Sequence, residues 1–161
     1  MKKFYSLLSL VAVLAFCSSS LINAQLVTKR TIGLELAKKL VAAAEAQAAK
    51  DNLAFVISIV DDGGNLVYLE RMDGAQLGSI EISMKKAQTA LNFKRSTKAY
   101  QDRVTEGATG IIALQNVLPF EGGVPLYVGK ELVGAIGVSG ASSTQDGVVA
   151  NAAAELLTSL K

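Results

Sequence analysis

Three charged side chains are the strongest candidates for recognising a small ligand. Arg71 and Asp73 stand two positions apart and are followed by Gly74, and Lys86 comes further along the chain. A guanidinium group matches the two oxygens of a carboxylate, so Arg71 would suit a carboxylate-bearing ligand. The alternative is that Arg71 and Asp73 pair with each other across a turn, while Lys86 is a solvated or snorkelling lysine. These residue types therefore indicate an anion site or a braced turn.

Glycine-rich segments offer a second kind of chemistry. Residues 134–140 read Gly-Ala-Ile-Gly-Val-Ser-Gly, and Gly122 and Gly123 are adjacent. Glycines between a strand and a helix can cradle phosphate, but glycine recurs here at every third residue, which is not the G-x-G-x-x-G spacing. Small residues in a strand also let a helix or another subunit approach the backbone closely, and this interpretation is favoured. No NAD site is predicted.

Ser139 resembles the nucleophile of a hydrolase, but the rest of the sequence argues against that role. The chain contains no His, and Ala141 stands where the nucleophile motif requires Gly. The lack of His also removes the proximal haem ligand of globins and every His-containing zinc site. Asp61 and Asp62 begin a turn, where Asp commonly accepts hydrogen bonds from backbone amides, so a metal role is the minority interpretation. The sequence predicts neither triad chemistry nor a zinc site.

The first 24 residues have the order of a secretory signal. Lys2 and Lys3 precede an apolar stretch at 7–16, and small or polar residues follow at 18–24. A charged start, a short apolar core and a small-residue end are typical of a cleaved signal peptide. We therefore expect residues 1–24 to be a signal peptide and residues 25–161 to form one secreted or periplasmic domain.

Two alternatives for this segment are a lipid anchor and an uncleaved membrane anchor. Cys17 could carry a lipid, but the bulky Phe16 precedes it. An uncleaved membrane anchor would need about 20 apolar residues, more than this core contains, so no membrane span is expected after processing. Removing residues 1–24 takes Lys2 and Lys3 from the 16 basic residues and leaves all 14 acidic ones, so the charges balance. A neutral chain without a basic block does not suit nucleic acid.

The apolar patterning predicts an α+β domain. Helical spacing of apolar residues alternates along the chain with β-branched runs that are bounded by turn residues. We expect an antiparallel sheet backed by helices. The expected elements are a helix at 34–50, a hairpin of 54–60 and 66–71, a helix at 76–93, an irregular segment at 94–114 with helical turns near 99–103, a hairpin of 124–128 and 132–139 turning at Gly129-Lys130, and a last helix capped by Ser143 and Asp146.

Several motifs occurring in order resemble the GlcG/HbpS family. They are Ile59-Val60-Asp61-x-Gly63-Gly64, Arg71-Met72-Asp73-Gly74, Lys86-Ala87-x-x-Ala90, Gly122-Gly123-Val124-Pro125-Leu126, the 134–140 segment and Gln145-Asp146. The family is one of haem-degrading or corrinoid-accessory domains, also found at the C-terminus of PduO proteins. The resemblance implies a profilin-like fold with a five-stranded antiparallel sheet, homo-oligomers and, in some members, binding of haem or a related tetrapyrrole. The sequence departs from the family pattern at Glu121, where Pro is common, and at Gly147, where an acidic residue is expected.

The resulting expectation is an exported, oligomeric protein that binds a tetrapyrrole or another small carboxylate-bearing ligand. Two alternatives are a haem-degrading enzyme and a ligand-free structural or interaction module. The candidate binding residues are Arg71, Asp73, Lys86, Gly122, Gly123 and Ser139. Arg71 would pair with a carboxylate and Lys86 would add charge. If haem binds, the iron ligand is left open among Tyr100, Tyr127, Met84, a hydroxyl group and water, since His is absent.

Overall fold

The structure is a computed structural model that describes residues 27–159. The predicted signal peptide at 1–24 therefore lies outside the described residues. The elements along the chain are α2 (Leu34–Ala48), η1 (Ala49–Asp51), β1 (Val56–Asp61), β2 (Leu66–Arg71), α3 (Ser79–Phe93), α4 (Lys98–Thr105), η2 (Thr109–Ala113), β3 (Gly123–Val128), β4 (Glu131–Ser139) and α5 (Ser143–Ser159). The predicted order of helices and hairpins is confirmed, and most element ends shift by only a few residues.

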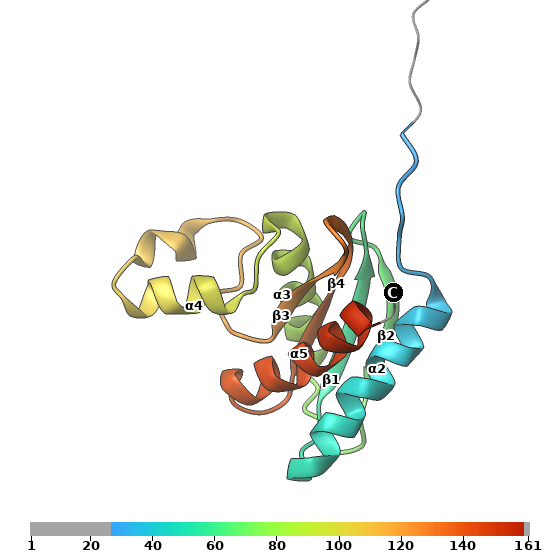
Figure 1. Cartoon of the computed structure of the whole chain (residues 1–161). Helices are drawn as coiled ribbons and strands as arrows, with labels where there is room; N and C mark the ends of the chain where they lie inside the picture. The colour runs from blue at the N-terminus through green and yellow to red at the C-terminus, as the bar shows by residue number, and fades with distance from the viewer. Residues whose placement is uncertain (1–26, 160–161) are drawn as a thin grey trace, which may run out of the picture.

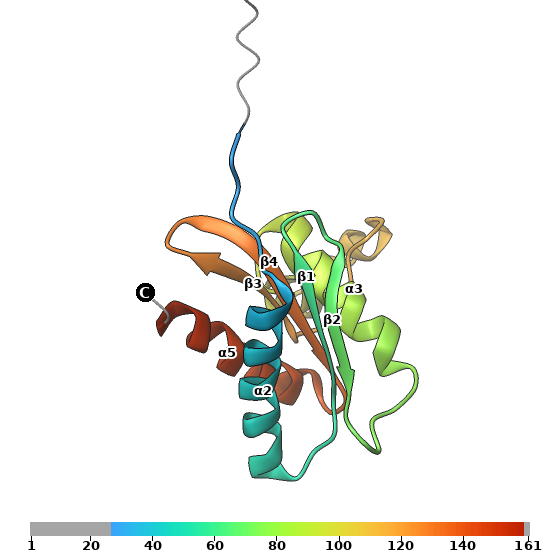
Figure 2. The same cartoon turned by 90° about the vertical axis from the view of Figure 1, so that its right-hand side faces the viewer.

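The four strands form one antiparallel sheet in the order β2-β1-β4-β3. Figure 2 shows α2 and α5 on one face of this sheet and α3 on the other. The expectation of an α+β fold is thus confirmed, whereas the fifth strand implied by the family resemblance is absent from the described residues. The apolar runs of the sequence had indicated only four strands, because the segment between α3 and β3 lacks a β-branched alternating run and forms α4 and η2 instead.

The main core lies between the sheet and the pair α2 and α5. Ile57, Ile59, Ile136 and Val138 point to this face and are fully buried. Their partners come from the apolar stripes of the two helices, which the helical spacing of the sequence had marked. The opposite face carries a smaller cluster around Ala87, where α3 packs.

Helix α3 packs unusually close to β4 because the strand carries small residues. A Cβ atom at Gly137 would overlap the carbonyl oxygen of Ser83 and come within 2.6 Å of the amide nitrogen of Ala87. The hydroxyl groups of Ser58 and Ser83 lie 2.7 Å apart in the same buried layer. Gly137 therefore allows the close approach of the chain's own helix, as the favoured interpretation predicted, whereas Gly134 and Gly140 meet Ile32 and Phe55.

An arm containing α4 and η2 extends away from the sheet and its main layers (Figure 1). Its tip and return, residues 107–120, contain no charged residue. Three large apolar side chains of this stretch, Ile112, Leu114 and Phe120, are exposed. An exposed, uncharged apolar stretch is typical of an interaction surface.

The two hairpin turns follow the predicted chemistry. Asp61 accepts hydrogen bonds at its Oδ1 from the amides of Gly63 and Asn65, at 2.9 and 2.8 Å, so it organises its turn. Gly129 has a φ of +64°, which suits glycine at the first position of the two-residue turn between β3 and β4. The sequence predicted both features: an aspartate that accepts hydrogen bonds from backbone amides at 61, and a two-residue turn at Gly129-Lys130.

Candidate functional site

A buried ion pair joins α3 to the start of α5. The Nζ of Lys86 donates to Oδ2 of Asp146 at 2.5 Å and to the carbonyl oxygen of Val138 at 3.0 Å. Lys86 is 1% exposed and Asp146 is 3% exposed. The ammonium group predicted to face a ligand is therefore directed inward, so a ligand contact by Lys86 is not favoured by this geometry.

The first turn of α5 directs Asp146 toward this pair. Ser142 and Gln145 form a reciprocal capping box, in which the Gln145 amide donates to Ser142 Oγ and the Ser142 amide donates to Gln145 Oε1. The predicted box of Ser143 and Asp146 is thus wrong by one residue. Asp146 cannot act as the capping acid, because its Oδ1 accepts hydrogen bonds from the amides of Gly140 and Ala141.

Burial favours the neutral forms of both Lys86 and Asp146. Desolvation lowers the pKa of Lys86, and the hydrogen bond and charge of Asp146 oppose that shift. Desolvation likewise raises the pKa of Asp146, against the hydrogen bond and charge of Lys86 and the two amide donors. Each charge is therefore kept in the interior by the other, which is typical of a structural ion pair.

Gly122 and Gly123 leave room for the Lys86 side chain and backbone. Gly122 has a φ of +124°, and a Cβ there would lie 2.8 Å from the Cβ of Asp146 and 2.9 Å from Lys86 Nζ. A Cβ at Gly123 would overlap the carbonyl oxygen of Lys86. The structure brings these two predicted site residues to Lys86, but as packing positions around its ion pair.

The two departures from the family pattern meet beside the ion pair. The carboxylate of Glu121 occupies the space into which a Cβ at Gly147 would project. Burial raises the pKa of Glu121, while the charges of Lys98 and Lys86 oppose this. An acidic group thus stands next to the start of α5 although Gly147 has no side chain to supply one.

Ser139, Arg71 and Asp73 lie at one end of the sheet. Ser139 Oγ donates to Ser79 Oγ at 3.2 Å, and Ser139 is buried. Arg71 and Ser139 both pair with Val56, so their Cα atoms stand two strands apart, about 10 Å. Arg71 and Asp73 do not form one of the ion pairs of the described residues. The Arg71 guanidinium instead donates to the carbonyl oxygen of Ala75 at 3.5 Å. Ser139 lies between Val138 and Gly140, which bond to Lys86 and Asp146. Ser139 therefore belongs with Lys86, Gly122 and Gly123, whereas Arg71 and Asp73 form a separate group.

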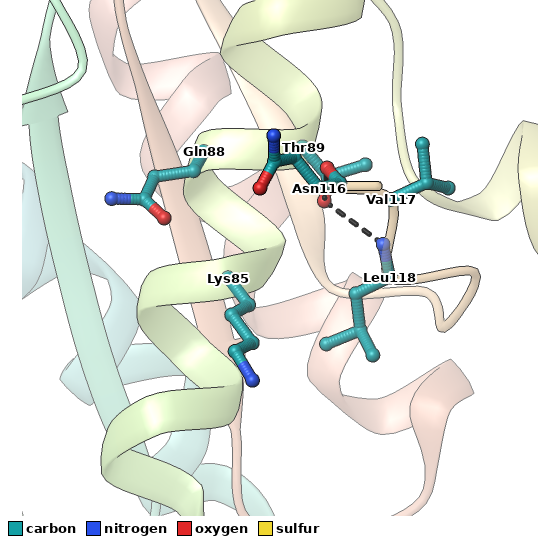
Figure 3. A pocket seen from close by; sticks show the side chains of 6 residues that line it. All are labelled: Lys85, Gln88, Thr89, Asn116, Val117 and Leu118. Atoms are coloured by element: carbon teal, nitrogen blue, oxygen red, sulfur yellow. Dashed lines mark hydrogen bonds between the residues drawn. The ribbon is translucent and has the colours of Figure 1, made fainter. Parts of the chain in front are cut away.

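A cavity of about 300 Å³ opens between α3 and the segment before β3. Figure 3 shows the lining residues, which are Lys85, Gln88, Thr89, Asn116, Val117 and Leu118. The Lys85 ammonium and the Leu118 side chain extend to the same side of the opening, whereas the Gln88 side chain is directed away from them (Figure 3). A cation beside an apolar side chain suits an amphipathic anion.

Thr89 connects the two walls of this cavity. Its Oγ1 accepts a hydrogen bond from the Leu118 amide at 3.0 Å and donates to the Asn116 carbonyl oxygen at 3.3 Å. Asn116 has a φ of +65°, a left-handed conformation that Asn tolerates better than most residues. Sequence reasoning missed the cavity residues, although Lys85 and Gln88 lie on the polar side of the predicted helix and were the available signal.

Residues 27–159 contain no group of three His, Cys, Asp or Glu side chains that would hold a metal ion. No helix in that range is both long enough and apolar enough to cross a membrane.

The described residues form an α+β domain with a close-packed α3, a buried Lys–Asp pair and an open cavity bordered by Lys85. The chain belongs to the family described as "Haem degrading protein HbpS-like", whose model matches residues 32–155. This confirms the family that the sequence motifs indicated.

Curated relatives agree with this assignment. Protein GlcG of Escherichia coli K12 is 39% identical over 112 residues, which cover 70% of this chain and 84% of GlcG. The corrinoid adenosyltransferase PduO of Salmonella typhimurium is 36% identical over 120 residues, which cover 71% of this chain. They cover only 35% of PduO, so the similarity concerns one part of that protein.

Solved structures show the same architecture. A double mutant of HbpS from Streptomyces reticuli matches with a TM-score of 0.76 and 31% identity, covering 84% of this chain and 92% of that one. A complex of PduOC with haem matches with a TM-score of 0.69 and 32% identity, covering 78% of this chain and 94% of that one.

Proposed function

We propose that this chain is an exported, oligomeric protein that binds haem or a related tetrapyrrole. The observation that supports this most is the similarity to PduOC, a domain whose structure was solved with haem. The relation to HbpS and to one part of a corrinoid adenosyltransferase supports a tetrapyrrole as the ligand class. Export rests on the predicted signal at residues 1–24.

The cavity beside α3 fits part of such a ligand. Its volume of about 300 Å³ lies at the lower end of ligand pockets, about 300–1,000 Å³, so a tetrapyrrole would extend beyond it. A second subunit would then cover the remaining surface of the ligand. Bound haem would supply its own redox chemistry, while the protein positions it.

The candidate iron ligands differ in their surroundings. Tyr100 is buried, with its ring edge-to-face with Phe93 at 5.6 Å between centroids. The hydroxyl group of Tyr127 donates to the carbonyl oxygen of Lys94 at 3.3 Å. Met84 is half-buried and immediately precedes Lys85 on α3. Both tyrosines are thus engaged within the fold, which favours Met84 or an exogenous ligand such as water.

Haemin binding tests the proposal directly. Titrating haemin into the purified chain should produce a saturable Soret band that is shifted from that of haemin in the same buffer. Because the chain has no His, the band should also differ from that of a His-ligated protein. A spectrum that stays equal to free haemin at all protein concentrations would contradict tetrapyrrole binding and favour a ligand-free module.

Haem degradation is the second candidate function, and the description of the matching family favours it. In this case the bound haem would activate oxygen and the chain would only orient it. Adding a reductant in air to the haem-loaded protein separates the two functions. A Soret band that bleaches faster than that of free haemin indicates degradation, whereas a protected band indicates a binding protein.

Self-association now rests on a different surface from the one that the sequence suggested. The small residues of β4 are covered by the chain's own elements, with Gly137 under α3 and Gly134 against Ile32. The exposed side chains Ile112, Leu114 and Phe120 on the arm remain available for contact with another copy.

Light scattering of the purified protein should give a molar mass greater than that of one chain, and Ile112→Glu should lower that mass. A native mass of one chain at high concentration would contradict an oligomer.

A further inference from the structure

We infer that the cavity between α3 and residues 116–118 binds the carboxylate of the ligand through Lys85. The ligand class is an amphipathic anion, with a carboxylate at Lys85 and an apolar body against Leu118. This inference deepens the proposed function, since it specifies which residue recognises the charged end of a tetrapyrrole. It also moves the anion site away from Arg71, where sequence reasoning had placed it.

The charges of the cavity lining favour an anion. Lys85 is the one charged residue among the six that line the cavity, and the others are neutral. In contrast, a cavity near the β3–β4 turn is lined by two lysines and two acidic residues, whose charges cancel; its lining is Lys29, Asp62, Lys94, Glu131 and Leu132. The first cavity thus has an uncompensated positive charge.

Lys85 has no ion-pair partner within residues 27–159, in contrast to the adjacent Lys86. Lys86 is paired with Asp146, and Lys98 is paired with Asp102 at 2.7 Å. Lys85 is exposed, and its ammonium group extends beside Leu118 at the opening (Figure 3). An unpaired cation at a cavity mouth can bind an incoming carboxylate without first breaking an internal salt bridge.

The wall opposite Lys85 is held in place before a ligand arrives. Thr89 bonds both the carbonyl group of Asn116 and the amide of Leu118, so these two hydrogen bonds fasten the 116–118 segment to α3. A preformed wall lowers the ordering cost of binding. Arg71 does not line this cavity, and it donates to the carbonyl oxygen of Ala75 within its own turn.

Affinity measurements on charge-removing variants test this inference. Lys85→Met should weaken haemin binding about tenfold, because it removes one charge-assisted hydrogen bond, while Lys85→Arg should retain most of the affinity. Lys130→Met removes an equal charge from the exposed turn between β3 and β4, away from the cavity. This variant should bind haemin as the native chain does. Equal haemin affinity in Lys85→Met and native protein would overturn the inference.

Two further probes separate this inference from the proposed function. The dimethyl ester of haemin keeps the ring and the iron but has no carboxylate, so native protein and Lys85→Met should bind it equally. Pyrenebutyrate, a fluorescent carboxylate with an apolar body, tests the anion site without a tetrapyrrole. Lys85-dependent binding of pyrenebutyrate without haemin binding would refute the tetrapyrrole function and keep the anion site. No Lys85 dependence with either acid would refute the anion site.

Discussion

Lys86→Met should destabilise the protein by about 3–5 kcal/mol, because it leaves the Asp146 carboxylate buried without its cation. Asp146 would keep only the amides of Gly140 and Ala141 as donors. Such a loss is a large fraction of the 5–15 kcal/mol that typically stabilises a domain. Urea denaturation followed by circular dichroism would measure it.

The exposed pair of Lys98 and Asp102 provides the matched control. Its two side chains are about half exposed, so Lys98→Met should cost only about 0.3–0.5 kcal/mol. The double variant Lys86→Met/Asp146→Asn should recover part of the loss, since it removes both charges from the interior. A cost for Lys86→Met no greater than that for Lys98→Met would show that the buried pair is not needed for stability.

The cost of Lys86→Met should also depend on pH. Burial raises the pKa of Asp146, and removing Lys86 takes away the main opposing influence. A carboxyl group with a raised folded-state pKa binds its proton more tightly when folded, so stability falls as pH rises above the unfolded value, about 3.9. Below that pH the group is neutral in both states. The difference in free energy of unfolding between Lys86→Met and the native protein should therefore become smaller as the pH is lowered toward about 4.

Gly137→Ala should destabilise the protein by about 3 kcal/mol, which is the second large effect. The new methyl group would overlap the backbone of α3 at Ser83 and crowd the amide of Ala87, and neither can move unless the helix moves. Because α3 also carries Lys85 and Thr89, the displacement would change the shape of the cavity. The loss of stability is measurable by thermal unfolding.

Gly78→Ala is the matched control for this prediction. Gly78 precedes α3 with a φ of −61°, and a Cβ there meets no atom within 4 Å. Its substitution should change stability by no more than about 0.5 kcal/mol. If Gly137→Ala and Gly78→Ala unfold at the same temperature, the close approach of α3 to β4 is not a requirement of the fold.

Local patterns in the sequence determined most of the secondary structure. The helical spacing around Ala37, Leu40 and Val41 predicts α2, and the β-branched runs predict the four strands, because both periodicities are properties of neighbouring residues. The turns at Asp61 and Gly129 are equally local. The family was also recognisable, since its short motifs survive in order along the chain.

Only the tertiary structure decided what the charged residues do. Lys86 finds Asp146 across 60 positions of sequence, and the cavity forms because Thr89 bonds a segment nearly thirty residues further on. A lysine on a helix has the same local pattern whether its charge is solvated, paired or facing a ligand. The choice depends on the desolvation cost and on partners brought near by the packing of α3 against β4, and neither is encoded in the spacing of adjacent residues.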